Sequence, residues 1–343
     1  MPLRLSALDH LRGLGILLVF LFSFWYWLYP GGAVPALIEH NVPGQVHAGD
    51  FVFALFIFCS GVSLWFFCAR ARQTRVPLDS ALGRYLRLLG LALLISATRL
   101  FVPFPDEVLI IALSALIALL VVWLGRPLLS GLWALAVVAV FSGLKFGAPA
   151  FWSSLTAPYL GGFTAVFYYS LLTLAAAIIS ARAFPRARLE PGSIPSLWNS
   201  WGWALAGLAL TLPLGLPDKV GLSFSFLALS LAIFIPLLVL AIRIFDAGGL
   251  RLPLAGRIGA SSLAGWAVFY AVSALVWYRD WGNRLDPSLY VLFCAALYVL
   301  LALALHLLDF ARERLKNGFF AARVRLPDAS PPVRASRRAD ASV

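Results

Sequence analysis

Ten long apolar segments fill most of the chain, and they limit it to one kind of environment. Hydrophobic residues make up 62% of the 343 residues and charged residues 12%, whereas about a quarter of the residues in soluble domains are charged. A helix needs roughly 17–25 apolar residues to span the hydrocarbon core of a bilayer. Candidate segments occupy residues 13–29, 51–68, 85–103, 107–124, 127–144, 162–181, 201–217, 222–242, 258–277 and 288–308. The sequence therefore predicts an all-α fold, a polytopic integral membrane helical bundle with about ten transmembrane helices.

The lysines and arginines indicate the orientation of this bundle. With ten crossings, 22 of the 27 basic residues fall on the side of the two termini, and the other side holds only Arg99, Lys145, Lys219, Arg279 and Arg284. Because basic residues concentrate in cytoplasmic loops, we expect both termini in the cytoplasm. As a separate expectation, the membrane is a bacterial-type inner or plasma membrane. The net charge of +12 then reflects topology and contact with anionic lipid, and we expect no nucleic-acid binding.

The chain divides into one large domain and a tail. Residues 1–311 are expected to form a single transmembrane domain whose first apolar segment is retained, because its cleavage as a signal peptide would reverse the first end. Residues 312–343 are basic and rich in Pro, Ser and Ala, which predicts a disordered cytoplasmic tail. Cys59, Cys68 and Cys294 lack metal-ligand spacing, so we expect buried free thiols and no metal site.

The gap between the first two segments, residues 39–53, gathers groups suited to proton transfer. Two of the four histidines, His40 and His47, lie there with Glu39 and Asp50. Histidine titrates near neutral pH, and a nearby carboxylate can hold its tautomer. Asp50 could equally be favoured only by its place at a helix N-terminus, and either histidine could be an ordinary loop residue. The residues alone leave these alternatives open.

Two further pairs of charges stand at the starts of segments. Asp9 and Arg12 are one helical turn apart, so they share a face and can pair. They mark either a helix start capped by Ser6, with Asp9 complementing the helix dipole, or an ion pair beside a cytoplasmic ligand site. Arg84 and Arg87 have the same spacing. Spacing alone favours membrane anchors over a phosphate clamp.

Several of these segments resemble a known family. The opening RLSALDHLRGLGILLVF resembles the entry motif of the transmembrane acyltransferase superfamily, and DFVFALFIFCSGVSLWF resembles its second helix. The subgroup most similar is the heparan-alpha-glucosaminide N-acetyltransferase-like proteins and their bacterial relatives. There a catalytic histidine precedes the second-helix aspartate by ten residues, a spacing that His40 reproduces with Asp50 and His47 does not. The resemblance thus implies catalysis by His40, supported by Asp50.

The resemblance also implies where the donor binds. Arg84 and Arg87 resemble the basic pair that opens the third helix on the coenzyme A side. The segment LPLAGRIGASSLAGWAVFYAV weakly resembles a later helix start, which places Arg257 on the same cytoplasmic face. Arg12 is expected beside them, with Asp9 in support.

The function implied is a membrane acyltransferase. An acyl group, most simply acetyl, passes from cytoplasmic acyl-CoA to an amine or hydroxyl of an extracytoplasmic sugar-like acceptor, with acyl-CoA as co-substrate and no permanently bound cofactor. His40 acts as general base or carries the acyl group briefly, and Asn41 or backbone amides stabilise the oxyanion.

Two alternatives to this function stay open. One is a transporter of a small anion or lipid-linked sugar. The other is a non-catalytic membrane scaffold, because the fourth segment lacks a histidine that relatives often carry. The oligomeric state, including a homodimer, is also left open.

Overall fold

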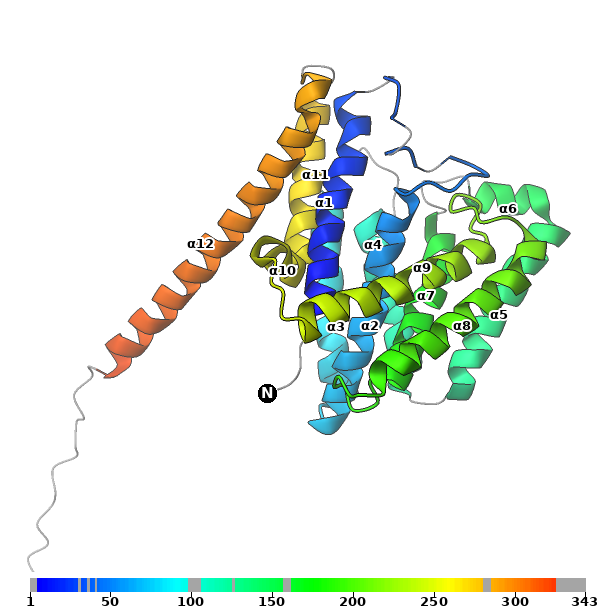
Figure 1. Cartoon of the computed structure of the whole chain (residues 1–343), viewed down its shortest axis with the longest axis horizontal. Coiled ribbons are helices and arrows are strands. Elements are labelled where there is room, and N and C mark those ends of the chain that lie inside the picture. The colour runs from blue at the N-terminus through cyan, green and yellow to red at the C-terminus, as the bar shows by residue number, and fades with distance from the viewer. Residues whose placement is uncertain are drawn as a thin grey trace, which may run out of the picture. The chain divides into compact units, whose positions relative to one another are not determined.

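The structure, a computed structural model, describes residues 5–29, 32–35, 38–40, 42–97, 106–124, 127–156, 162–279 and 285–324. For Ala81, Arg84, Pro127, Trp277 and residues 315–324 it describes the backbone only. Across these residues the fold is all-helical, as the sequence predicts. The helices are α1 (Ser6–Leu28), α2 (Asp50–Gln73), α3 (Leu78–Ser96), α4 (Glu107–Trp123), α5 (Pro127–Gly147), α6 (Pro149–Thr156), α7 (Gly162–Ala183), α8 (Ser193–Thr211), η3 (Leu212–Leu214), α9 (Phe224–Ala241), the π-helix η4 (Ile242–Ala247), α10 (Pro253–Ala260), α11 (Ser262–Tyr278), η5 (Pro287–Leu289) and α12 (Tyr290–Val324) (Figure 1).

The chain divides into two compact units, Met1–Ala302 and Leu303–Val343. The first unit holds α1 to α11 and the beginning of α12, and the second holds the rest of α12. The predicted boundary between residues 311 and 312 lies within α12. Residues 312–324 are helical, where the sequence predicts a disordered tail, and residues 325–343 lie outside the described part. The helix continues because this stretch, RERLKNGFFAARV, contains no proline and is rich in good helix formers.

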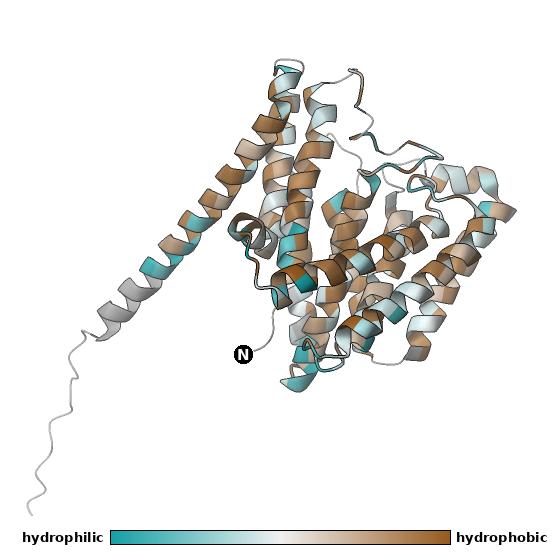
Figure 2. Ribbon diagram, in the orientation of Figure 1, coloured by the Kyte–Doolittle hydropathy of each residue, from teal (hydrophilic) through white to brown (hydrophobic). Residues whose placement is uncertain are grey.

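Length and apolarity support fewer membrane spans than the ten predicted. In the described part of the chain six helices are long and apolar enough to cross a membrane, or up to seven if α10 and α11, bent by 86° at their junction, count as one broken span. The expected count of about ten is therefore not supported on this criterion. Helix α4 is too short at 17 residues. Polar side chains dilute the apolar character of α3 and α8, as their paler and teal positions in Figure 2 indicate.

The first four helices run alternately between two ends of the first unit. We name the arginine end after Arg12, near the start of α1, and the histidine end after His40, whose backbone N–H donates to the Tyr26 hydroxyl near the end of α1. Helix α2 returns to the arginine end, where Arg72 donates to carbonyls at the end of α4. Helix α4 begins at the other end, where its N-cap Asp106 accepts from Ser96, the last residue of α3.

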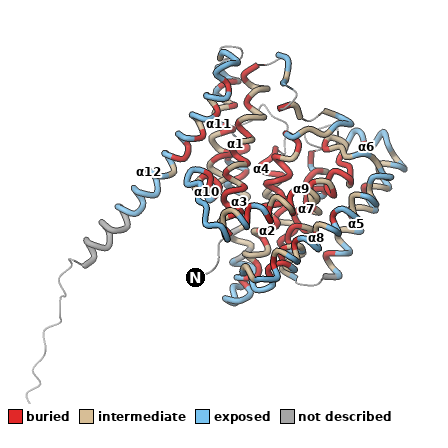
Figure 3. The backbone as a smooth tube through the Cα atoms, in the orientation of Figure 1, coloured by how far each residue is buried: buried red, intermediate tan, exposed pale blue. Residues whose placement is uncertain are grey.

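Small residues let the helix backbones approach closely, as is common in membrane proteins. A Cβ atom on Gly259 of α10 would lie 1.6 Å from the Asp9 carbonyl oxygen, and one on Gly13 of α1 would lie 1.9 Å from that of Ala255. Gly61 of α2 meets the Thr173 carbonyl of α7 in the same way, at 2.2 Å. Figure 3 shows the result, with α2 and α7 largely buried and α5 largely exposed.

The start of α1 is capped from a distant part of the chain. The backbone N–H groups of Ser6 and Ala7 donate to the two carboxylate oxygens of Asp246, at 2.9 and 3.0 Å. The predicted cap by Ser6 is wrong, because Ser6 is already inside the helix and the N-cap position is Leu5. Asp246 lies in the π-helix η4 that follows α9, so this contact fixes the end of α9 at the arginine end.

Candidate active site

His40 is held in one tautomer at the histidine end. Its Nδ1 atom lies 3.0 Å from the carbonyl oxygen of Ile38. Because a carbonyl only accepts hydrogen bonds, Nδ1 must carry the proton, and in the neutral ring Nε2 keeps its lone pair. The Tyr26 ring contacts the imidazole edge-on, with centroids 4.6 Å apart. His40 is therefore oriented, partly exposed and competent to accept a proton.

A buried ion pair lies beside this histidine. Asp50, the first residue of α2, is fully buried, and its Oδ1 atom lies 3.6 Å from Nζ of Lys219. Its Oδ2 atom accepts a 2.9 Å hydrogen bond from the backbone N–H of His47. Lys219 belongs to the loop between η3 and α9, and only 4% of its surface is exposed. The Asp50 carboxylate is near enough to act on His40 electrostatically, but the group that accepts the Nδ1 hydrogen bond is the Ile38 carbonyl.

A small cavity brings His40 together with Lys219 and a further carboxylate, that of Glu107. It measures about 30 Å³ and is lined by His40, Gly49, Glu107, Lys219, Trp266 and five residues of α1 and α2. Glu107, at the start of α4, is buried and accepts a 2.8 Å hydrogen bond from the Tyr270 hydroxyl of α11. An imidazole, an ammonium group and the Glu107 carboxylate thus line a space large enough for a small reacting group, and Asp50 adjoins it through its ion pair with Lys219.

The charges around the cavity set the protonation of His40. Burial lowers the pKa of His40 below its ordinary value, and the Lys219 ammonium lowers it further, while the Ile38 bond and the two carboxylates oppose these effects. Burial also lowers the pKa of Lys219, and Asp50 and Glu107 counteract this shift by favouring the ammonium form. A lowered histidine pKa keeps the ring neutral near pH 7, the form that a general base needs.

His47, the rival histidine, lies at the rim of this region. Its Nε2 atom is 3.1 Å from the side-chain oxygen of Gln45, and its Nδ1 atom is 3.8 Å from a carboxylate oxygen of Glu39. Among the described residues that line the cavity, His40 is present and His47 is not. Asn41, the predicted oxyanion donor, lies outside the described residues.

The arginine end contains a larger cavity of about 640 Å³. Asp9, Arg12, Arg70 and Arg87 are its charged lining residues. Arg12 lies 4.0 Å from Asp9 and donates to the Cys59 carbonyl and the Ser63 hydroxyl of α2. The predicted Asp9–Arg12 pair is thus present and faces a cavity.

The structure does not place the other two predicted donor-site arginines, Arg84 and Arg257, on this cavity. The side chain of Arg84 lies outside the described part of the structure. Arg257, in α10, is not among the described lining residues of this cavity, although Ala260 of the same helix is. Arg70 lines the cavity without belonging to any predicted donor motif. The sequence signal that could have indicated it is its position at the start of the first inner loop.

A third cavity lies between the other two. It measures about 420 Å³ and shares Arg12, Ser63, Phe67 and Ala260 with the arginine cavity. At its other side it shares Trp266 with the small cavity of His40. Helices α1, α2, α3, α4 and α11 supply most of its lining. The three cavities therefore follow one another from Arg12 to His40, with Trp266 between the second and the third.

Sequence reasoning missed three members of the site. In the sequence Lys219 is only one of five basic residues on the outer side, and no motif includes Glu107 or Tyr270 as a site residue. The available signals were a lone lysine in a short loop and a glutamate opening an apolar segment. Ionisable groups next to membrane spans are costly to bury and commonly functional.

Fold and site together define an integral membrane protein of several apolar helices, with a buried acid–base cluster at one end and an arginine-lined cavity at the other. Residues 4–201 match the family model described as heparan-alpha-glucosaminide N-acetyltransferase, catalytic. The match covers more than half of the chain, so the protein belongs to this family, as its sequence motifs predict. A comparison with curated proteins found no match. Among the site residues, Lys219, Arg257, Trp266 and Tyr270 lie beyond the matched region.

Proposed function

We propose that the protein transfers an acetyl group from cytoplasmic acetyl-CoA to an amine or hydroxyl of an extracytoplasmic sugar-like acceptor, and that His40 carries the chemistry. Family membership supports a membrane N-acetyltransferase. The observation that supports the finer proposal is the series of three cavities, because it links a basic end to an acid–base end through shared lining residues.

The donor would enter from the arginine end. Arg12, Arg70 and Arg87 offer guanidinium groups, which suit the phosphates of coenzyme A because they form charge-assisted, forked hydrogen bonds. The middle cavity has mostly apolar and small side chains, which suits the uncharged arm of the donor. Its end at Trp266 directs the thioester toward His40. Arg84 stays in this proposal through its motif, and Arg257 as a more distant contributor.

At the histidine end the reaction is an acyl transfer. The acceptor nitrogen or oxygen attacks the thioester carbonyl carbon while Nε2 of His40 removes the acceptor proton. The carbon–sulfur bond then breaks, and the proton on Nε2 passes to the coenzyme A sulfur, so the imidazole returns to its neutral form. Asp50 and Glu107 favour the transient imidazolium because both carboxylates lie near it. A route through an acyl-histidine remains the alternative mechanism.

We also propose that ten helices cross the membrane with both termini in the cytoplasm. The alternation of α1, α2, α3 and α4 between the two ends supports this count. So does α12, whose Tyr290 hydroxyl donates to the Leu21 carbonyl and whose Tyr298 donates to that of Gly13, because these contacts direct it back toward the start of α1. The excess of basic residues at the arginine end supports a cytoplasmic location for it.

Turnover by the purified protein tests the function. The protein is mixed with radiolabelled acetyl-CoA and glucosamine, and acetylated sugar and free coenzyme A are quantified. We expect equal amounts of both products, at a rate that His40→Ala reduces strongly. If neither amine nor hydroxyl sugars release coenzyme A above the rate of His40→Ala, the proposal is wrong. Uptake of unmodified sugar into proteoliposomes would then favour a transporter.

A further inference from the structure

Lys219 is a lysine buried at a place where burial is costly. It is 4% exposed, and its partner Asp50 is fully buried. Removing an ion pair from water costs several kcal/mol per ion, which their attraction only partly offsets. An exposed lysine would satisfy the topology of an outer loop equally well. The buried position therefore needs an explanation beyond charge distribution.

The loop that carries Lys219 is built to hold it inward. The Asp218 backbone N–H donates to the Ser223 hydroxyl at 2.7 Å, and the Asp218 carboxylate accepts from Gly221 N–H at 3.0 Å. The buried Tyr168 of α7 donates to the Ser223 carbonyl. Leu222 adopts φ +49°, a left-handed conformation that costs a bulky residue free energy and persists only where the surroundings enforce it. These contacts fix the backbone on both sides of Lys219.

The position of Lys219 relative to His40 is the decisive observation. Both side chains line the same cavity of about 30 Å³, which has room for only a group as small as a carbonyl with its substituents. A reacting carbonyl that reaches His40 in this space also lies against the lysine. An acyl transfer develops negative charge on that carbonyl oxygen, and preorganised donors aimed at it are the largest single source of rate in such reactions.

Building on the proposed function, we propose that Lys219 is the electrophilic catalytic residue, whose ammonium donates a hydrogen bond to the carbonyl oxygen of the acyl thioester as the acceptor attacks. His40 takes the acceptor proton and returns it to the sulfur, and Lys219 keeps its own proton throughout. Asp50 then has the role of holding Lys219 charged and pointed into the cavity. Lys219 lies beyond the residues that match the family model.

A purely structural role, in which Lys219 only neutralises Asp50, makes different predictions. Both roles allow a loss of activity in Lys219→Met, but only an electrophile changes how the rate depends on the carbonyl itself. Fluoroacetyl-CoA has a more electrophilic carbonyl than acetyl-CoA and needs less assistance. The ratio of the two turnover rates, fluoroacetyl over acetyl, is therefore the informative measurement, because a general defect in folding or binding lowers both rates alike.

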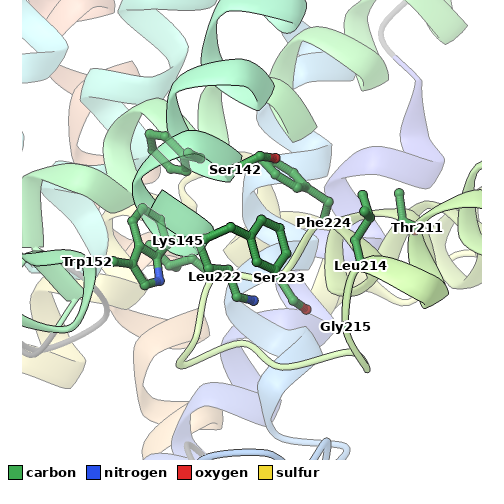
Figure 4. A pocket seen from close by; sticks show the side chains of 11 residues that line it. Ser142, Lys145, Trp152, Thr211, Leu214, Gly215, Leu222, Ser223 and Phe224 are labelled. Carbon is green, nitrogen blue, oxygen red and sulfur yellow. The ribbon is translucent and has the colours of Figure 1, made fainter. Parts of the chain in front are cut away.

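The experiment compares Lys219→Met, Lys219→Arg and the control Lys145→Met in the full-length protein. Lys145 is a second lysine of the outer side. It lines a separate small pocket with Trp152 and with Gly215 and Ser223, two residues of the loop that carries Lys219 (Figure 4). In Lys219→Met we expect kcat with acetyl-CoA to fall roughly 10²–10³-fold, as for loss of an oxyanion donor. The dissociation constant for acetyl-CoA should stay unchanged, and the fluoroacetyl ratio should rise. Lys145→Met should behave as wild type.

Lys219→Arg keeps the inference testable if Lys219→Met does not fold. It preserves the charge beside Asp50, but a guanidinium is larger than the ammonium and the cavity is small. We expect kcat to fall and the ratio to rise in this variant also. A wild-type kcat, or a lowered kcat with an unchanged ratio, would overturn the role of Lys219. If the wild-type protein itself transfers no acyl group, the proposed function fails, and that outcome is distinct from a failure confined to the Lys219 variants.

Discussion

The Nδ1 atom of His40 donates to the carbonyl oxygen of Ile38 across 3.0 Å. This one contact decides which ring nitrogen can accept a proton, because it commits the proton to Nδ1 and leaves the lone pair on Nε2. A backbone carbonyl orients the ring without adding a full negative charge. It therefore raises the pKa of His40 less than a bonded carboxylate would, and burial keeps the net shift downward.

The two loop histidines should differ sharply in a substitution experiment. His40→Ala should reduce acyl transfer by about 10²–10⁴-fold, the usual effect of losing a general base, and leave acetyl-CoA binding intact because the arginine cavity lies at the other end. His47→Ala should turn over nearly as wild type, since its side chain contacts Gln45 and Glu39 at the rim. Turnover and binding are measured at matched expression and detergent stability. The reverse pattern would move the catalytic assignment to His47.

Turnover should depend on pH through His40. Its pKa is lowered, first by burial and then by the Lys219 ammonium, so the neutral base persists below the pH at which an ordinary histidine protonates. We expect kcat/KM to be constant around pH 7 and to fall only as the pH drops below about 6.5, the usual histidine value. Lys219→Met should move this acid limb to higher pH, because Tyr26, Asp50 and Glu107 remain around the ring without the opposing ammonium. An acid limb that starts above pH 7 in the wild type would contradict this assignment.

Gly49 should be required for the position of the imidazole. A Cβ atom at this residue would lie 2.9 Å from Cβ of His40 and 3.2 Å from its Nδ1, closer than side-chain atoms normally approach. Gly49→Ala should therefore displace the ring and lower kcat by about tenfold or more, while acetyl-CoA binding is retained. Gly143→Ala is the matched control, because Gly143 has open space around it. Equal kcat values in the two variants would show that the ring tolerates the shift.

The exposed arginines of the arginine cavity should contribute to donor affinity rather than to rate. Arg70 and Arg87 are solvent-exposed, so screening limits each contact to about 1 kcal/mol, roughly fivefold in the dissociation constant for coenzyme A. Arg70→Gln and Arg87→Gln should each show this loss, and raised salt should reduce the difference. Arg186→Gln is the control, since Arg186 pairs with Glu190 on the surface at the same end. If Arg186→Gln weakened coenzyme A binding as much as Arg87→Gln does, both losses would reflect nonspecific electrostatic attraction.

The sequence predicted those parts of the fold that depend on local composition. Apolar runs are local, so each predicted segment contains a helix, but runs alone overstated how many helices satisfy the length and apolarity of a membrane span. The family motif selected His40 and Asp50 by their ten-residue spacing. In the structure Lys219 connects the two residues, because it lines a cavity with His40 and pairs with Asp50.

The remaining features depend on contacts between distant segments. Lys219 meets Asp50 only because the loop before α9 folds onto the start of α2, and Asp246 caps α1 only because η4 ends beside it. No local sequence pattern around Lys219 or Asp246 predicts these partners. The chain of cavities likewise arises from the packing of five helices and has no counterpart in a linear motif.

Labelling of single introduced cysteines can test the ten-crossing topology at the helices that least resemble membrane spans. The helices to test are α3, α4 and α8, which do not meet the length and apolarity of a span by themselves. We expect Pro43→Cys, Ala97→Cys and Leu216→Cys to react with a membrane-impermeant maleimide in intact cells, and Gln73→Cys and Gly192→Cys to react only after permeabilisation. All five positions are exposed, and the native cysteines are buried, so the parent protein is the unlabelled control. Protection of Ala97→Cys would remove the crossings by α3 and α4, and protection of Leu216→Cys would remove that by α8. Either result would require a different path between the arginines and His40.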